Sequence, residues 1–189
     1  FRRVLFRSVA SLAALDIAAR MPDLASHLFL IQGGDHEAFA RWKAGRDPRG
    51  ILGRPIVGQL LMRRLAAKRM PAWYALSVGR RNRVESFCRC AGTSLGHGAA
   101  WSLASAYQCY MGEVMDLPVP AQPMVSLWGG ADRSHPFANV HSLRSLRPDV
   151  HCETLSDLGH TPELEDPVAV LGILRDRKST RLNSSHSSV

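Results

Sequence analysis

Two short apolar runs, each closed by a Gly-Gly pair, constrain the fold of this chain most strongly. Residues 27–32 read HLFLIQ and residues 123–128 read PMVSLW. Runs of this length and composition are typical of strands buried on both faces of a parallel sheet. Glycine lets the chain turn sharply where such a strand ends. The sequence therefore predicts a buried sheet with tight turns at its strand ends.

Helical segments separate the predicted strands. Residues 9–21 are rich in Ala and Leu, contain neither Gly nor Pro, and stop at Pro22, which predicts a helix. The alternation of strands and helices favours an α/β fold with a mostly parallel sheet. The remaining predicted elements are a third strand over 150–155 and helices over 56–69, 99–115, 138–146 and 166–174.

Residues 35–98 are irregular and polar, and we interpret them as a mostly helical cap inserted into the α/β core. Pro48, Pro55 and Pro71 are expected to break regular structure there. Within the predicted helix over 56–69, Ile56, Leu60 and Leu61 are expected to form the buried face.

Composition excludes several classes of protein. The chain has 189 residues and a formal net charge of +8, and it contains no apolar run of the roughly 18 residues that a membrane helix needs. Its four cysteines form no CxxC pair, which argues against a zinc ribbon and a disulfide scaffold. We expect reduced thiols in a cytoplasmic protein. The cysteines are Cys88, Cys90, Cys109 and Cys152.

We interpret both ends of the chain as translated adapter DNA and not as native sequence. One DNA sequence, resembling a sequencing adapter, encodes DRKSTRLNSSH at residues 176–186 and, on its opposite strand, FRRVLFRS at residues 1–8. These ends carry five of the eight net positive charges, so the nucleic-acid interpretation loses its main support. The expected organisation is: 1–8 artefact, 9–34 start of the core, 35–98 cap, 99–175 C-terminal core, 176–189 artefact.

A carboxylate and an imidazole follow two of the predicted strands. Asp132 lies in the turn after residues 123–128, and His160 lies in the turn after residues 150–155. Reactive groups of open α/β sheets gather where the strands end. A buried Asp that orients a His creates the general base that a nucleophile needs. Asp132 and His160 are therefore the candidate acid and base; the alternative is that Asp132 caps a helix and His160 stands in an ordinary turn.

The motifs around these two residues resemble those of the α/β-hydrolase family. Its acid follows a strand in a G-x-x-D turn, matched by residues 129–132, and its histidine stands in GH-x-P-x-x-E-x-P, matched by residues 159–167. The resemblance covers most of residues 9–175 and is weakest in the cap. It implies hydrolysis by a nucleophile–His160–Asp132 triad, without a metal or organic cofactor.

The resemblance also implies a place for the nucleophile. Members of the family carry it on a sharp strand-to-helix turn, before the acid and the histidine in chain order. Counting back about fourteen residues from Pro22 gives Ser8. Because the codon of Ser8 belongs to the adapter-like end, the native residue is expected to be Ser or Asp. Val9 would donate an oxyanion N–H, although Ala10 replaces the glycine usual there.

We interpret the remaining motifs as parts of the structure and not as catalytic residues. Residues 92–96 spell G-x-S-x-G, but no clean strand precedes them, so we interpret Ser94 as part of a lid turn rather than as a nucleophile. Glu165 is expected to serve the start of the last helix. His97, His135 and His141 are expected in surface or core roles, and the aromatic residues Trp42, Trp73, Tyr74 and Trp101 in a pocket or in the core.

The resemblance implies that the chain is the C-terminal part of an α/β-hydrolase with a mostly helical cap. The resulting hypothesis is that the parent protein hydrolyses small esters or similar acyl compounds and that the chain as printed is inactive. The partner is a small-molecule substrate; neither nucleic acid nor a membrane is expected. A dehalogenase or epoxide hydrolase with an Asp nucleophile is one alternative. A binding protein without turnover on the same fold is another.

Overall fold

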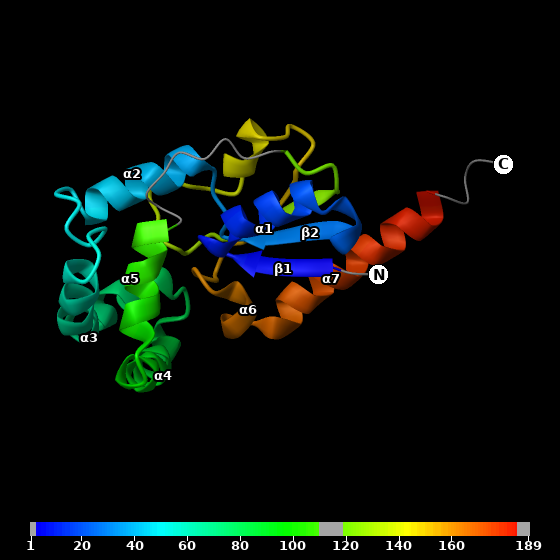
Figure 1. Cartoon of the computed structure of the whole chain (residues 1–189). Coiled ribbons are helices and arrows are strands. Elements are labelled where there is room, and N and C mark those ends of the chain that lie inside the picture. Colours follow the sequence, from blue (N-terminus) through cyan, green and yellow to red (C-terminus); the bar gives the residue numbers. More distant parts are fainter. Residues whose placement is uncertain (1–2, 110–118, 185–189) are drawn as a thin grey trace.

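Four parallel strands form the centre of the structure. The structure is a computed structural model that describes residues 3–109 and 119–184 (Figure 1). The strands are β1 (Arg3–Arg7), β2 (His27–Ile31), β3 (Met124–Gly129) and β4 (His151–Leu155), and they lie side by side in chain order. The predicted parallel α/β sheet is confirmed. β1 comes from residues 1–8, the segment that resembles an adapter, and pairs in register with β2 from Arg3 opposite His27.

Helices cover the two faces of this sheet. Successive residues of a strand point to opposite faces, and β2 shows this at Leu30 and Ile31, both fully buried. Leu30 belongs to a cluster with Leu12 and Leu15 of α1 (Ala10–Arg20). Ile31 packs in a second cluster with Val170 of α7 (Pro167–Ser184). The sheet is therefore buried on both faces, as its apolar strands require.

A group of helices lies beyond the carboxyl ends of the strands (Figure 1). The sequence predicted a mostly helical insertion here, and it is helical. α3 packs against both α4 and α5, and α2 connects this group to the end of β2. The helices are α2 (His36–Arg46), α3 (Val57–Ser77), α4 (Val84–Gly96) and α5 (Ala99–Cys109).

α3 corrects two sequence predictions. Pro71 lies inside this 21-residue helix and does not end it. A proline inside a helix costs one backbone hydrogen bond, and packing of α3 on α4 and α5 offsets that cost. The predicted buried face is also wrong: Ile56 and Leu60 are 71% and 54% exposed, whereas Gly58 and Met62 are buried.

Other boundaries differ in detail. Residues 138–146, predicted as a helix, form turns and one short 3₁₀ segment (Ser142–Ser145). The predicted helix 99–115 is observed over Ala99–Cys109, and its remainder lies outside the described residues. α7 continues past its predicted end at residue 174 to Ser184, and the short α6 (Pro162–Glu165) precedes it. Within the described ranges, no helix is both long and apolar enough to cross a membrane.

Candidate active site

Position 8 forms a sharp turn between a strand and a helix. Ser8 follows β1 directly, has a φ of 52°, and precedes α1, whose N-cap is Val9. A positive φ is uncommon for a residue other than glycine and marks strained backbone. This turn is held by the Ser8 N–H, which donates to the Ile31 carbonyl at 2.9 Å, and by the Ser8 carbonyl, which accepts from the Ser11 N–H at 2.9 Å. The expected nucleophile position therefore has the geometry of a strand-to-helix elbow.

Asp132 and His160 meet at the same edge of the sheet. Asp132 follows β3 and His160 follows β4, and the His160 Nδ1 lies 2.9 Å from the Asp132 Oδ2. Both side chains are buried, with 0% of Asp132 and 4% of His160 exposed. The structure thus joins the two residues that the sequence proposed as a pair, although 28 positions separate them.

Hydrogen bonds keep the Asp132 carboxyl ionised. Its Oδ1 accepts from the Ser134 N–H at 2.7 Å and from the Ser134 hydroxyl at 2.6 Å. Burial by itself would raise the pKa of this carboxyl, but hydrogen bonds from His135, His160 and Ser134 outweigh burial and hold the pKa well below its usual range. A carboxylate in this state can orient an imidazole and stabilise its charged form.

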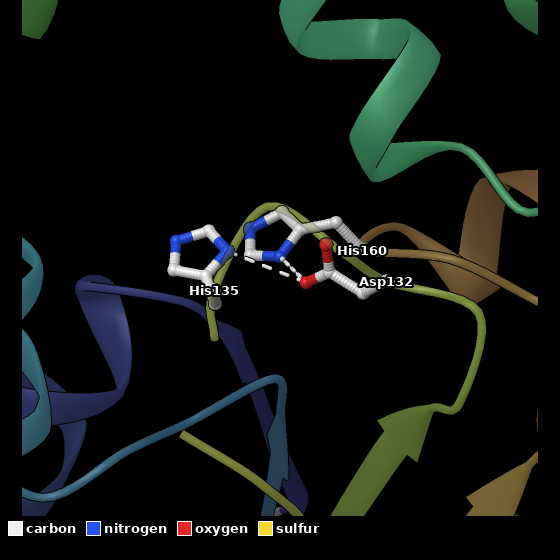
Figure 2. A group of neighbouring side chains, drawn as sticks. All are labelled: Asp132, His135 and His160. Carbon is white, nitrogen blue, oxygen red and sulfur yellow. Dashed lines mark hydrogen bonds and ion pairs between the residues drawn. The ribbon is translucent and has the colours of Figure 1, made fainter. Parts of the chain in front are cut away.

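A second imidazole, which the sequence analysis placed among structural residues, belongs to this cluster. The His135 Nδ1 lies 3.3 Å from the Asp132 Oδ2 and 2.8 Å from the Ser134 Oγ. The ring stacks on His160 with 4.3 Å between centroids and an interplanar angle of 11° (Figure 2). Its position three residues after Asp132 was the only sequence signal, and that spacing alone does not distinguish a cluster member from a surface residue.

The same three residues are the candidate ligands for a metal ion. Asp132, His135 and His160 each offer one ligand atom, and these atoms lie within 4.8 Å of one another. A ring nitrogen directs its lone pair in the plane of the ring, so an ion bound by both imidazoles must lie in both planes. The two rings are nearly parallel, and such planes do not converge on one ion. The arrangement suits two N–H donors that share one carboxylate oxygen.

The C-terminus of α3 lies against both loops of the cluster. The Ser77 carbonyl accepts from the His160 N–H at 2.6 Å, and the Leu76 carbonyl accepts from the Arg133 N–H at 3.0 Å. The last carbonyls of a helix have no partner within it, and here the loops that carry Asp132 and His160 supply the donors. The C-terminal carbonyls of α3 thereby hold the backbone of the two loops that carry the acid and the base.

Comparison with solved structures identifies the architecture. The chain superimposes on a probable hydrolytic enzyme from Pseudomonas aeruginosa with a TM-score of 0.64 at 19% identity, covering 92% of this chain and 62% of that one. The superposition on a thermophilic esterase has a TM-score of 0.65 at 14% identity and covers 94% of this chain and 65% of the esterase. The superposition on an epoxide hydrolase from Bacillus megaterium has a TM-score of 0.59 at 16% identity and covers 91% of this chain and 67% of the epoxide hydrolase.

The chain has part of the α/β-hydrolase fold. It spans about two thirds of the length of these neighbours. No family model matches its sequence, and no curated protein matches it either. The likeness is therefore one of fold, at identities below 20%.

Within this α/β-hydrolase fold, Glu165 has a different role from the expected one. It is almost completely buried, and its carboxylate accepts from the backbone N–H groups of Gly79, Arg80 and Gly159 at 2.9–3.0 Å. Asp166 serves the start of α7 instead, because its side chain accepts from the Ala169 N–H. Glu165 thus connects the segment after α3 to the loop of His160.

The G-x-S-x-G sequence at residues 92–96 is not an elbow of this fold. It lies in the last turns of α4, and the Ser94 hydroxyl donates to the Cys90 carbonyl within that helix. The expected lid turn is therefore wrong, because the segment continues a helix. The structure gives Ser94 no strand-to-helix turn of the kind found at position 8.

Two aromatic residues of the helical region contact the histidines. Trp42 of α2 stacks on His135 at 5.2 Å, and Trp73 of α3 packs edge-on against His160 at 5.7 Å. Tyr74 packs on Trp73 instead, and Trp101 is 42% exposed. The cap therefore supplies the aromatic surroundings of the imidazole cluster through Trp42 and Trp73.

Proposed function

We propose that this protein hydrolyses small esters or similar acyl compounds, with His160 as the general base and Asp132 as the residue that orients it. The observation that carries the proposal is the 2.9 Å contact between the His160 Nδ1 and the ionised Asp132 carboxylate. Support comes from the strand-to-helix turn at position 8, because β1, β3 and β4 are parallel and end at one edge of the sheet.

The proposed reaction has the two steps of a serine hydrolase, acylation and deacylation. The His160 Nε2 takes the proton from a hydroxyl at position 8 while that oxygen attacks the carbonyl carbon of the ester. The imidazolium then gives this proton to the departing alkoxide, which leaves as an alcohol, and an acyl-enzyme remains. Water, deprotonated by His160, attacks the acyl-enzyme and releases the acid and the free hydroxyl.

Two features support the charged intermediates of this reaction. Asp132 places a negative charge 2.9 Å from the His160 Nδ1, which stabilises the imidazolium. Val9 is the N-cap of α1, and the N–H groups at the start of a helix have no acceptor within the helix. The Val9 N–H is accordingly our candidate donor to the oxyanion.

An Asp at position 8 would change the reaction. Its carboxylate would open an epoxide or displace a halide to form an ester, and His160 would activate the water that hydrolyses this ester. The neighbours include both esterases and an epoxide hydrolase. The native residue at position 8 therefore decides between the two chemistries, and the ester hydrolase is our primary proposal because two of the neighbours are esterases and one is an epoxide hydrolase.

The first experiment is to read the source DNA outward past both ends of the printed sequence, and then to express the protein that it encodes. We expect turnover of p-nitrophenyl acetate if position 8 is Ser, and of an epoxide or haloalkane if it is Asp. Asp132→Asn and His160→Gln should each lower kcat by about three to four orders of magnitude. The control is His141→Ala, an exposed histidine of the same region.

Two results would overturn the proposal. One is a native residue at position 8 that is neither Ser, Cys nor Asp, which would favour a binding protein on this fold. The other is turnover that persists undiminished in His160→Gln.

A further inference from the structure

His135 is not a member of the proposed triad, yet its ring contacts the candidate base His160 directly. Its ring lies between two others: Trp42 stacks on it at an interplanar angle of 12°, and His160 stacks on it at 11°. Only 9% of its side chain is exposed. The cap helix α2 is thereby connected to the candidate base through a continuous stack of three rings.

The hydrogen bonds around His135 determine which of its nitrogens carries the proton. The Ser134 hydroxyl has a single proton, and its oxygen lies 2.6 Å from the Asp132 Oδ1. An ionised carboxylate only accepts, so the hydroxyl proton is directed to it. The His135 Nδ1, 2.8 Å from the same hydroxyl oxygen, must therefore donate. Neutral His135 is the Nδ1–H tautomer.

His160 is held in the same tautomer by the same carboxylate. Its Nδ1 lies 2.9 Å from the Asp132 Oδ2, and the His135 Nδ1 lies 3.3 Å from that atom. Asp132 thus accepts twice from Ser134 and once from His160, and the His135 N–H, which donates to the nearer Ser134 Oγ, makes a longer contact with its Oδ2. A carboxylate held from several directions cannot rotate away from the imidazole that it orients.

We propose that His135 is a positioning residue for His160: it holds the Asp132 carboxylate from a second direction and packs face to face on the His160 ring. Both effects keep His160 as the Nδ1–H tautomer, with Nε2 directed away from Asp132. This inference rests on the proposed function.

Trp42 supports His135 through a second contact. Its indole N–H donates to the Ser134 carbonyl at 3.2 Å, so Trp42 holds the backbone of the segment as well as the ring. Arg46 of the same helix lies over the Trp42 ring, at 5.8 Å from its centroid. The helix α2 therefore acts on His160 through His135.

The test reads histidine tautomers in ¹⁵N-labelled protein by long-range ¹H–¹⁵N correlation, without substrate. We expect Nδ1–H signals for His135 and His160. The exposed His141 should favour Nε2–H, the form that free imidazole side chains prefer in water. His135→Ala removes both the N–H and the stack, and should shift His160 toward a mixture of tautomers. His135→Phe keeps an aromatic ring and loses only the N–H, so it should change the His160 signals less.

In the active protein, His135→Phe should lower kcat about tenfold with KM unchanged, the rate equivalent of one hydrogen bond. His141→Phe should change neither constant. The proposal is overturned if His135 is the Nε2–H tautomer, or if the His160 signals are the same in wild type, His135→Ala and His135→Phe. Because the tautomers are read without turnover, this failure is distinguishable from failure of the hydrolase proposal, which depends on His160→Gln and on position 8.

Discussion

At the scale of single residues, the site depends on one buried carboxylate. The Asp132 side chain is completely inaccessible, and its oxygens receive donors from Ser134, His135 and His160. An uncompensated buried charge would be strongly destabilising, so this set of donors is a condition for keeping the carboxylate ionised. The sequence motif identifies Asp132, but its donors come from two different loops.

This carboxylate predicts a specific dependence of stability on pH. The pKa of Asp132 in the folded state lies below its ordinary value, so its stabilising effect is complete above the unfolded-state pKa. It is lost as the pH falls below about 4, where the unfolded chain takes up a proton that the folded chain does not. We expect the difference in unfolding free energy between wild type and Asp132→Asn to decline below that pH in urea titrations.

Asp157→Asn is the matched control, because the Asp157 side chain is 71% exposed. Its effect on the unfolding free energy should stay small at every pH. A difference between wild type and Asp132→Asn that is flat from neutral pH to about pH 2 would contradict the prediction.

At the scale of elements, three loops meet at glycines. Gly129 ends β3, Gly159 precedes His160, and Gly79 follows α3. A Cβ built on Gly129 would overlap the Gly159 carbonyl, and one built on Gly159 would overlap the Ser77 carbonyl. The cap, the loop of Asp132 and the loop of His160 can approach this closely only because these positions lack side chains.

Gly159→Ala tests this junction. The added methyl would lie 2.5 Å from the Gly79 nitrogen and 2.8 Å from the Glu165 Oε1, in addition to the overlap at Ser77. Because the nearest atoms belong to the backbone, we expect a loss of about 3 kcal/mol in unfolding free energy, measured by urea denaturation.

Gly92→Ala is the control within the same chain. The added methyl would meet no atom within 4 Å, and Gly92 stands inside α4, so stability should rise by about 0.5–1 kcal/mol. Equal effects of the two substitutions would rule out a steric role for Gly159.

At the scale of the whole molecule, the sheet needs a helix on each face. α1 covers one face through Leu12 and Leu15, and α7 covers the other through Val170, joined by Ile173 and Leu174. The α7 contacts in this cluster are made before residue 176, where the segment that resembles an adapter begins. Among the α7 side chains that the structure describes, those of residues 167–175, these first turns make the contribution to the core.

Truncation after residue 175 should accordingly leave the thermal midpoint within about 2 °C of the full chain. Val170→Ala, which removes a buried side chain at the same face, should cost about 2 kcal/mol. Differential scanning calorimetry of both variants checks the prediction. If the truncated chain loses as much stability as Val170→Ala, residues 176–189 contribute to the fold.

Elements encoded by local pattern were predictable from the sequence. The apolar runs of β2 and β3, the helix α1 and the pairing of Asp132 with His160 all follow from periodicity, turn residues and the rule that strand ends converge. These features depend on neighbours in the sequence or on one known topology. Local information was therefore sufficient for the core and for the two candidate residues of the triad.

Tertiary packing decided what local pattern could not. Pro71 stays inside α3 because two other helices pack on it, and Glu165 binds backbone groups of the segment after α3, more than eighty positions away. His135 belongs to the site because Trp42 and His160, which come from distant elements, stack on its ring. The sequence by itself determined the strands β2, β3 and β4 and the acid–base pair. Only the folded chain determined which side chains surround that pair, because such contacts depend on how distant elements pack in space.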